Sequence, residues 1–280
     1  MSKPRHSVFP SADTDAHRAE AVPDTPQGRS PSYRLAWDDD TFLRGDALRP
    51  VRLQLEMLKP ELAMQDRGIA STVVFFGGAR VPAPEEAERV AAVKPQLAAL
   101  APFYGEARAL ARLVGEECLR RGGRDFVVVT GGGPGVMEAG NRGAEDVGAP
   151  SIGLNIVLPS EQQPNPHITP ELCFQFHYFG IRKMHFLMRA RALVVFPGGF
   201  GTLDELFETL TLIQTKRMAP IPVVLFGEAF WRSVVNWEAL RDAGVIAENA
   251  LELIAFAETA ADGWTLIRDA VAPGAGEGAL

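Results

Sequence analysis

The sequence predicts an α/β fold, in which helices flank a doubly wound parallel sheet of about five to seven strands. The first observation is a set of short segments that are apolar at nearly every position, as is typical of strands covered on both faces. These segments are 72–76, 126–130, 151–157, 192–196 and 221–226, with a mixed one at 173–178. The second observation is helical periodicity between them, because strands that alternate with helices form parallel βαβ units.

Helices are expected at 104–121, 137–147, 180–191, 202–217 and 230–243. The first of these keeps Ala107, Leu110, Val114 and Cys118 near one face, which favours packing of that face onto a sheet. Segment 94–102 contains two prolines and interrupts the stretch between the first strand and this helix. Residues 50–66 also show a helical pattern, and no internal repeat is visible.

The N-terminal region differs in composition from the rest of the chain. Residues 1–48 are polar and rich in Pro, Ser, Asp and Arg, which predicts an extended or partly disordered arm. Within it, segment 33–42 carries Tyr33, Trp37 and Phe42 and is a candidate for packing onto the body. Residues 49–280 are predicted to form a single domain.

Charge and composition exclude several classes of function. The formal net charge of −7 argues against a general nucleic-acid-binding protein, but backbone N–H groups can still hold one phosphate on an acidic protein. The chain has no apolar run of about 18 residues and no secretory signal pattern, so a membrane partner is not expected. Its two cysteines, Cys118 and Cys173, form no disulfide or zinc pattern and are expected to be reduced in a cytoplasmic protein.

Glycine clusters follow three of the predicted strands, at 77–78, 131–135 and 198–201. In a doubly wound sheet the ligand lies beyond the carboxyl ends of the strands, where glycine allows backbone N–H groups to approach an anion. The alternative is that each cluster is a tight turn that requires positive φ. Three clusters on one edge of the sheet favour an anion site.

The familiar phosphate motifs do not fit these clusters. In GxGxxG spacing, Gly133 and Gly135 are followed by Glu138, and Gly199 and Gly201 by Asp204, where a third glycine is needed. The chain contains no Gly-Lys pair and therefore no P-loop. These absences point to a ligand smaller than a dinucleotide or a triphosphate.

Polar residues beside the clusters are candidates for binding and chemistry. Thr202 begins the predicted helix 202–217, where it can cap the helix, bind a phosphate oxygen, or do both. Glu205 lies one turn beyond the glycines, from where a carboxylate can reach the sugar of a nucleotide. Asp204 favours the positive end of the helix dipole, and this structural role is its simplest interpretation.

A second polar group begins the predicted helix 180–191. Arg182 and Lys183 oppose the helix dipole there, which suggests that they serve a ligand or an acidic partner rather than the helix itself. The alternative is a solvated basic face that also carries His185 and Arg189. Arg80, after the first strand, gives a similar but weaker signal. The five histidines show no metal-ligand spacing, so no metal site is expected.

The segments GGGPGVMEA (131–139) and PGGFGTLDE (197–205) resemble the two signature motifs of the LOG family, and Arg182-Lys183 matches the arginine–lysine pair between them. The resemblance covers roughly residues 70–245. The N-terminal 70 residues are similar to the extension of longer bacterial members. The resemblance implies a Rossmann-like fold and a homodimer or a higher assembly of dimers.

The resemblance also implies a phosphoribohydrolase that needs no cofactor. Such an enzyme cleaves the N-glycosidic bond of AMP or a cytokinin riboside 5′-monophosphate, releasing the base and ribose 5-phosphate. Arg182 and Glu205 match the family's catalytic residues. The candidates for substrate or phosphate binding are Arg80, Gly132, Gly133, Gly135, Glu138, Lys183, Gly198, Gly199, Gly201 and Thr202. Members are often labelled lysine decarboxylases, but the sequence offers no recognisable lysine for pyridoxal phosphate.

Two alternatives remain: a carrier that binds a nucleotide or molybdenum cofactor without chemistry, and a nucleotide-sensing regulator whose N-terminal arm contacts a partner. The presence of both Arg182 and Glu205 favours an enzyme. Base preference is not readable, because the base-facing side chains are expected on loops such as 159–170. The local hint of an oligomer is the apolar group Met184, Leu187 and Met188.

Overall fold

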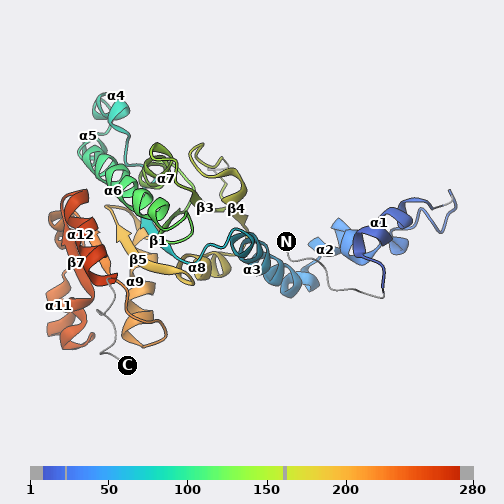
Figure 1. Cartoon of the computed structure of the whole chain (residues 1–280). Coiled ribbons are helices and arrows are strands. Elements are labelled where there is room, and N and C mark those ends of the chain that lie inside the picture. The colour runs from blue at the N-terminus through green and yellow to red at the C-terminus, as the bar shows by residue number, and fades with distance from the viewer. Residues whose placement is uncertain (1–8, 23, 160–162, 272–280) are drawn as a thin grey trace. The chain divides into compact units, whose positions relative to one another are not determined.

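The computed structural model describes residues 9–22, 24–159 and 163–271, which fall into two units, Met1–Lys59 and Pro60–Leu280. A sheet of seven parallel strands forms the centre of the larger unit, in the order β4-β3-β2-β1-β5-β6-β7 (Figure 1). The strands are β1 (Thr72–Phe76), β2 (Val127–Thr130), β3 (Ser151–Ile156), β4 (Cys173–Phe176), β5 (Ala190–Val195), β6 (Val223–Phe226) and β7 (Ile254–Ala257). The predicted Rossmann-like α/β fold is confirmed.

Strand order locates the point at which a ligand site is expected. From β1 the chain adds strands outward to β4, and it then returns to place β5 on the other side of β1. Phe76 at the end of β1 pairs with Val195 at the end of β5. The loops that leave these two strands run in opposite directions, and such a switch point leaves a crevice at the carboxyl edge of the sheet.

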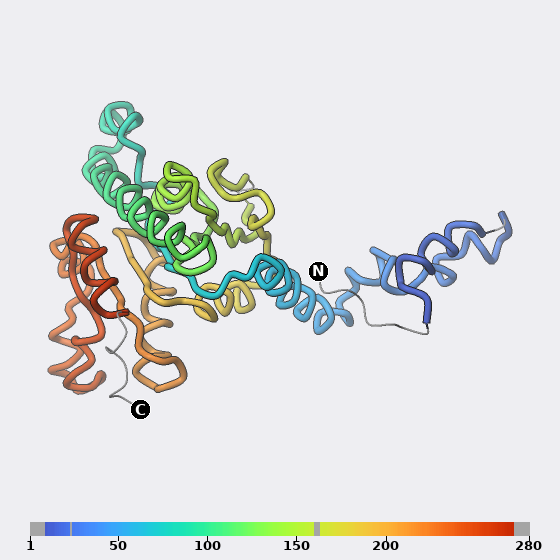
Figure 2. The backbone as a smooth tube through the Cα atoms, viewed as in Figure 1, coloured from blue at the N-terminus to red at the C-terminus, as the bar shows by residue number. Residues whose placement is uncertain are grey.

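Helices cover both faces of the sheet. Alternate residues of β1 point to opposite sides, so Val73 and Phe75 belong to one buried cluster and Val74 and Phe76 to the other. The first cluster includes side chains from α6 (Ala101–Arg120), α7 (Val136–Asp146) and α12 (Ala260–Val271). The other includes side chains from α3 (Arg49–Asp66), α8 (Phe179–Leu187), α9 (Phe200–Gln214), α10 (Glu228–Val234) and α11 (Trp237–Asp242). Figure 2 shows α6 beside α7 on the first face, where the two helices pack together.

Several boundaries differ from the prediction for local reasons. The helix predicted over 180–191 ends at Leu187, because β5 begins at Ala190. The helix predicted over 230–243 is two helices, and Asn236 caps the second by accepting the N–H of Ala239 at 3.0 Å. The segment 94–102 holds the short helix α5 (Pro95–Ala98), after another short helix, α4 (Ala87–Ala91). Strand β7 and helix α12 were not predicted.

Before α3, the smaller unit consists of short helices in its described part. They are α1 (Ala12–Glu20), α2 (Asp40–Arg44) and 3-10 turns at Pro31–Tyr33, Ala36–Asp38 and Asp46–Leu48, none with a buried residue. Arg52 Nη1 donates to the carbonyls of Leu43 and Gly45 at 2.7 and 2.6 Å. The region is thus helical rather than extended where it is described, while residues 1–8 and 23 of the predicted arm lie outside the described residues. Packing of segment 33–42 onto the body stays a prediction.

No helix in the described part of the chain combines the length and the apolar character needed to cross a membrane.

Candidate active site at the switch point of the sheet

The glycine turns after β1, β2 and β5 are joined by backbone hydrogen bonds. Gly78 N–H donates to the carbonyl of Pro197 at 2.9 Å, and Val136 N–H donates to the carbonyl of Gly78 at 3.3 Å. The three clusters predicted to share one edge of the sheet therefore meet there. Their backbone forms the floor of the candidate site.

The glycines in these turns differ in whether the surrounding structure leaves space for a side chain. A Cβ atom at Gly135, where φ is +69°, would lie 2.4 Å from the carbonyl oxygen of Gly78. One at Gly198 would lie 2.1 Å from Thr202 Oγ1, and one at Gly132, where φ is +76°, 2.3 Å from Asn155 Oδ1. By contrast, Gly199 and Gly201 have no atom within 4 Å of such a Cβ. The turns thus require the first three glycines, while the last two leave open space beside the backbone.

This difference predicts unequal effects on stability for two glycine-to-alanine variants. Gly135→Ala is expected to destabilise the protein by about 2–4 kcal/mol, because alanine is strained at positive φ and its methyl group meets the Gly78 carbonyl. Gly201→Ala lies in the first turn of α9 and is expected to be neutral or stabilising by up to about 1 kcal/mol. Urea unfolding of the two variants tests this, and equal stabilities would contradict the assignment of Gly135 to the turn.

A pocket of about 570 Å³ opens above these turns, within the size range of small-molecule sites. The backbone of Gly77, Gly78, Gly131, Gly133, Gly199 and Gly201 lines one part of it, together with Arg182, Thr202, Asp204 and Glu205. The remaining wall is largely apolar and includes Met137, Ile156, Leu158, Phe174 and Phe179, with Asn155, Gln163, Cys173 and Gln175 among them. Among the described residues, no three His, Cys, Asp or Glu side chains are grouped as metal ligands.

Glu205 is the buried acid of the pocket. Its side chain stands on α9 and the residue is only 6% exposed. Burial raises the pKa of Glu205 from its ordinary value of 4.5 to about 7, against the opposing effects of Lys183 and Arg182. Near neutral pH this carboxyl group therefore exchanges a proton readily, which suits a general acid or base.

The raised pKa of Glu205 makes stability depend on pH in a predictable direction. Since the folded protein holds this proton up to about pH 7 and the unfolded chain loses it near 4.5, the free energy of unfolding falls as pH rises through that window. Glu205→Gln removes the effect. Relative to the wild type, the free energy of unfolding of the variant is expected to be about 2–3 kcal/mol higher at pH 8 than at pH 5. This corresponds to several degrees in Tm. Thermal unfolding at both pH values tests this, and a pH-independent difference would contradict it.

Arg182 reaches the pocket from α8 and is held by the backbone of neighbouring strands. Its Nε donates to the carbonyl of Leu154 at 2.7 Å, and Nη2 donates to that of Gly131 at 3.5 Å. The guanidinium lies 5.2 Å from the ring centre of Phe186. Burial lowers the pKa of Arg182 while Glu205 raises it, and an arginine remains charged under these conditions. A fixed cation thus stands beside a titratable acid.

The other residues of the predicted basic face have different surroundings. His185 is buried, at 3% exposed. Arg189 lies beyond the end of α8 and forms a two-point ion pair with Glu61, at 2.7 Å for each contact. Neither these residues nor Arg182 form a solvated basic face, so that alternative interpretation is wrong.

Thr202 lines the pocket but does not cap α9. The helix begins at Phe200, two residues before the predicted start, and its N-cap is Gly199, which has no side chain. The capping interpretation of Thr202 is therefore wrong. The residue is 7% exposed, in the first turn of the helix beside Gly198, and its role in phosphate binding stays a prediction.

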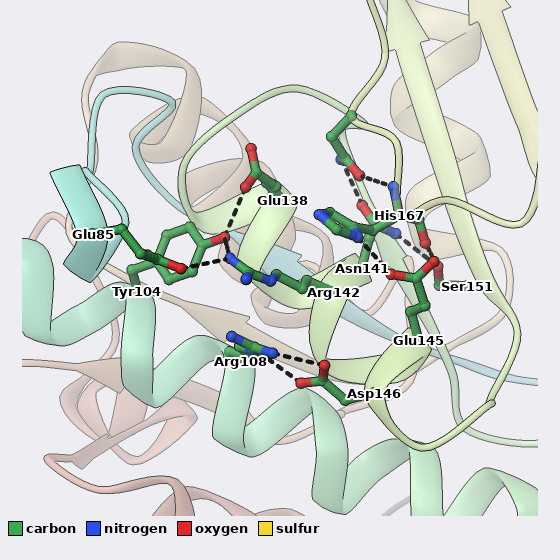
Figure 3. Close-up of polar contacts among 11 residues, drawn as sticks. Glu85, Tyr104, Arg108, Glu138, Asn141, Arg142, Glu145, Asp146, Ser151 and His167 are labelled. Carbon is green, nitrogen blue, oxygen red and sulfur yellow. Dashed lines mark hydrogen bonds and ion pairs between the residues drawn. The ribbon is translucent and has the colours of Figure 1, made fainter.

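Some of the predicted binding residues lie outside the pocket lining. Gly132, Gly135 and Gly198 belong to the turns beneath it, and Arg80 is exposed beyond it. Glu138 accepts the hydroxyl of Tyr104 at 2.8 Å, in a polar cluster with Arg142 (Figure 3). Lys183 points to Asp204 and Glu208, at 2.8 and 2.9 Å. The structure thus brings six predicted residues together: Gly133, Arg182, Gly199, Gly201, Thr202 and Glu205.

Two buried asparagines that the sequence analysis missed support the turn after β2. Asn141 on α7 is fully buried, and its Oδ1 accepts Thr130 Oγ1 at 2.7 Å and Asn165 Nδ2 at 2.9 Å. Asn165 also donates its backbone N–H to Gly132 and its amide to the carbonyl of Gly133, at 2.8 and 3.1 Å. Figure 3 shows Asn141 near Ser151, whose hydroxyl accepts its amide at 3.0 Å. In the sequence, Asn141 could have been noticed as a polar residue close to the small residues Ala139, Gly140 and Ala144 of the predicted helix.

The loop predicted to face the base is only partly described. Leu158, Gln163 and Pro164 line the pocket. Residues 160–162 of that loop lie outside the described residues. The base-facing role of the loop therefore stays a prediction.

Comparison with known proteins finds a family model that matches the part of the chain with Arg182, the turn after β5 and Glu205. Residues 137–267 match a family model described as possible lysine decarboxylase, and the match includes Arg182 and Glu205. This segment is therefore similar to that LOG-like family. The resemblance inferred from the two glycine motifs is confirmed. No curated protein matches the sequence significantly.

Solved structures similar to the chain include the molybdenum cofactor carrier protein of Chlamydomonas reinhardtii, which is 18% identical in sequence. The alignment covers 71% of this chain and 96% of the carrier protein, with a TM-score of 0.44. A second is TM1055, with 19% identity, coverage of 71% and 99%, and a TM-score of 0.42.

Proposed function

We propose that the pocket binds a nucleoside 5′-monophosphate such as AMP or a cytokinin riboside monophosphate, and hydrolyses its N-glycosidic bond to free base and ribose 5-phosphate. The observation that carries the proposal is the joint lining of one pocket by Glu205, Arg182 and the open backbone at the start of α9. The similarity of residues 137–267 to the LOG-like family supports the same activity. No cofactor is part of the proposed reaction.

The phosphate would bind at the N-terminus of α9. The N–H groups of Phe200, Gly201 and Thr202 precede the first hydrogen bond of the helix, which runs from Leu203 to the carbonyl of Gly199 at 3.0 Å. Helix N-termini favour anions through these free donors and the helix dipole. Because Gly199 and Gly201 carry no side chain and have open surroundings, a phosphate can approach the backbone closely there.

The ribose would then lie near Glu205. Cleavage of the C1′–N9 bond builds positive charge on the sugar, and an ionised carboxylate beside it stabilises that charge. Glu205 can also take a proton from the attacking water, whose oxygen adds to C1′ while the base leaves with a proton. Arg182 would orient Glu205 or the substrate through its fixed guanidinium. Phosphate binding at α9 would supply remote binding energy that aligns the sugar.

The lysine decarboxylase description of the family fits the pocket less well. A pyridoxal phosphate enzyme needs a lysine that forms a Schiff base with the cofactor. None of the described residues that line the pocket is a lysine, and Lys183 is paired with two acids instead. The residues present therefore favour hydrolysis over decarboxylation.

We also propose that the protein forms a homodimer. Met184 and Met188 are each 48% exposed, and Phe179 and Phe200 are 53% and 92% exposed. Exposed apolar side chains on α8, at its C-cap and at the start of α9 are of the kind found at interfaces. Light scattering coupled to gel filtration tests this, with a monomer as the contradicting result.

Incubation with a panel of nucleoside 5′-monophosphates, followed by chromatography of the free bases, tests the proposed reaction. We expect release of the base and an equal amount of ribose 5-phosphate from AMP or an N6-modified AMP. Binding of the nucleotide without release would instead favour the carrier alternative, and the nucleoside without phosphate serves as the control for phosphate recognition.

A further inference from the structure

Lys183 joins helices α8 and α9 through two ion pairs. Its Nζ lies 2.8 Å from Asp204 Oδ2 and 2.9 Å from Glu208 Oε2, and its side chain is 16% exposed. The two acids are one helical turn apart on α9, and Glu205 lies in the turn between them. A single cation on α8 therefore contacts the acid just before the proposed catalytic residue and the acid three positions after it.

Without Lys183, this turn of α9 would carry three acids, of which Glu205 would still face Arg182. Like charges one turn apart destabilise a helix, and each added negative charge disfavours ionisation of a buried neighbour. Asp204 and Glu208 retain 58% and 34% exposure of their side chains, so water screens them in part, whereas Glu205 is 6% exposed. The unscreened member of the group, Glu205, therefore depends most on a nearby positive charge.

We propose that Lys183 is a positioning residue, which holds α9 against α8 and balances the charge around Glu205 so that its carboxylate can form, rather than a ligand of the substrate phosphate. Two observations on the geometry support this role. Lys183 is absent from the described lining of the pocket, and its ammonium group is already engaged by two carboxylates. Its catalytic consequence rests on the proposed function, whereas its effect on the ionisation of Glu205 does not.

The charged groups that face Glu205 set the direction of the expected effects. They are Arg182 and Lys183 on α8, and Asp204 and Glu208 on α9. Of these, Lys183 lowers the pKa of Glu205 most, ahead of Arg182, while Glu208 and Asp204 raise it. Removal of the lysine charge is therefore expected to raise the pKa of Glu205, and removal of the two acids that Lys183 contacts is expected to lower it.

The test measures the ionisation of Glu205 without any substrate. The Glu205→Gln substitution is made in the wild type and in each variant below. The Tm of each protein with and without this substitution is measured from pH 4 to pH 9. The pH range over which the difference in Tm between the two proteins changes reports the titration of Glu205. We expect Lys183→Gln to move this pH upward by about one unit and Lys183→Arg to restore it. Arg108→Gln, which breaks the ion pair with Asp146 between α6 and α7, is the matched control and should leave it unchanged.

A double variant keeps the test usable if Lys183→Gln does not fold. Asp204→Asn with Glu208→Gln removes both partners of Lys183 and should move the titration of Glu205 downward. An unchanged titration in this variant, or in a folded Lys183→Gln protein, would overturn the proposal.

Kinetics then separate positioning from phosphate binding. For Lys183→Gln we expect the acid limb of the pH–rate profile to move upward with the titration, while KM for AMP stays within about threefold. A tenfold rise in KM without movement of the profile would overturn the proposal in favour of a phosphate ligand. If the wild type releases no base from any nucleotide, the proposed function fails, and the titration of Glu205 still decides the role of Lys183.

Discussion

Replacement of Glu205 by glutamine is expected to reduce base release from AMP by about 10²–10⁴-fold, while binding of AMP changes by less than about threefold. Glutamine keeps the size of the buried side chain on α9 but can neither ionise nor accept a proton. The phosphate site at the start of the helix is untouched, so ground-state binding should persist. Single-turnover release of adenine and calorimetric titration with AMP measure the two quantities separately.

The matched control for this variant is an acid remote from the pocket. Glu238→Gln lies on α11, where the carboxylate pairs with Arg232 at the surface, and its rate should equal that of the wild type. Undiminished release in Glu205→Gln would remove the catalytic assignment. A parallel loss of AMP binding would instead assign Glu205 to substrate binding.

Replacement of Arg182 by methionine is expected to lower kcat/KM by about 10²–10³-fold, which corresponds to about 3–4 kcal/mol of transition-state stabilisation. Methionine fills much of the space over Phe186 but loses the bonds to Leu154 and Gly131 and the positive charge beside Glu205. Since Arg182 lowers the pKa of Glu205, its removal should also move the acid limb of the pH–rate profile upward.

A lysine at position 182 distinguishes charge from geometry. Arg182→Lys retains a cation but cannot reproduce the two-point contact of a guanidinium, so partial activity is expected, with a profile near that of the wild type. Wild-type turnover in Arg182→Met would contradict both proposed roles of the arginine, and circular dichroism of the variant guards against loss of fold.

The sheet was predictable where the sequence carried a strong local signal. Strands β1, β2 and β5 each contain a run of apolar residues and precede a glycine turn, and the turns after them build the site. Strand β7 (Ile254–Ala257) was missed because it follows a 3-10 turn (Glu248–Leu253) with no glycine or proline to mark it. The end of α8 was placed too late because its helical pattern continues through Arg189, and only pairing of Ala190 with Thr72 of β1 ends it.

The candidate site was predictable in its motifs but not in its contacts. The glycine turns and the positions of Arg182 and Glu205 followed from sequence patterns near predicted strand ends. The partners of Lys183 depend on how α8 packs against α9, which no local pattern specifies. For the same reason, the support that Asn165 gives to the turn after β2 joins residues 32 positions apart and was not readable.

Whether this pocket breaks a glycosidic bond is tested most directly by incubation of the full chain with AMP and N6-modified AMP, with free base and ribose 5-phosphate quantified together. We expect equal amounts of the two products from the wild type and almost none from Glu205→Gln, with both proteins binding the nucleotide. Saturable binding of AMP by the wild type with no base released from any nucleoside monophosphate would contradict it.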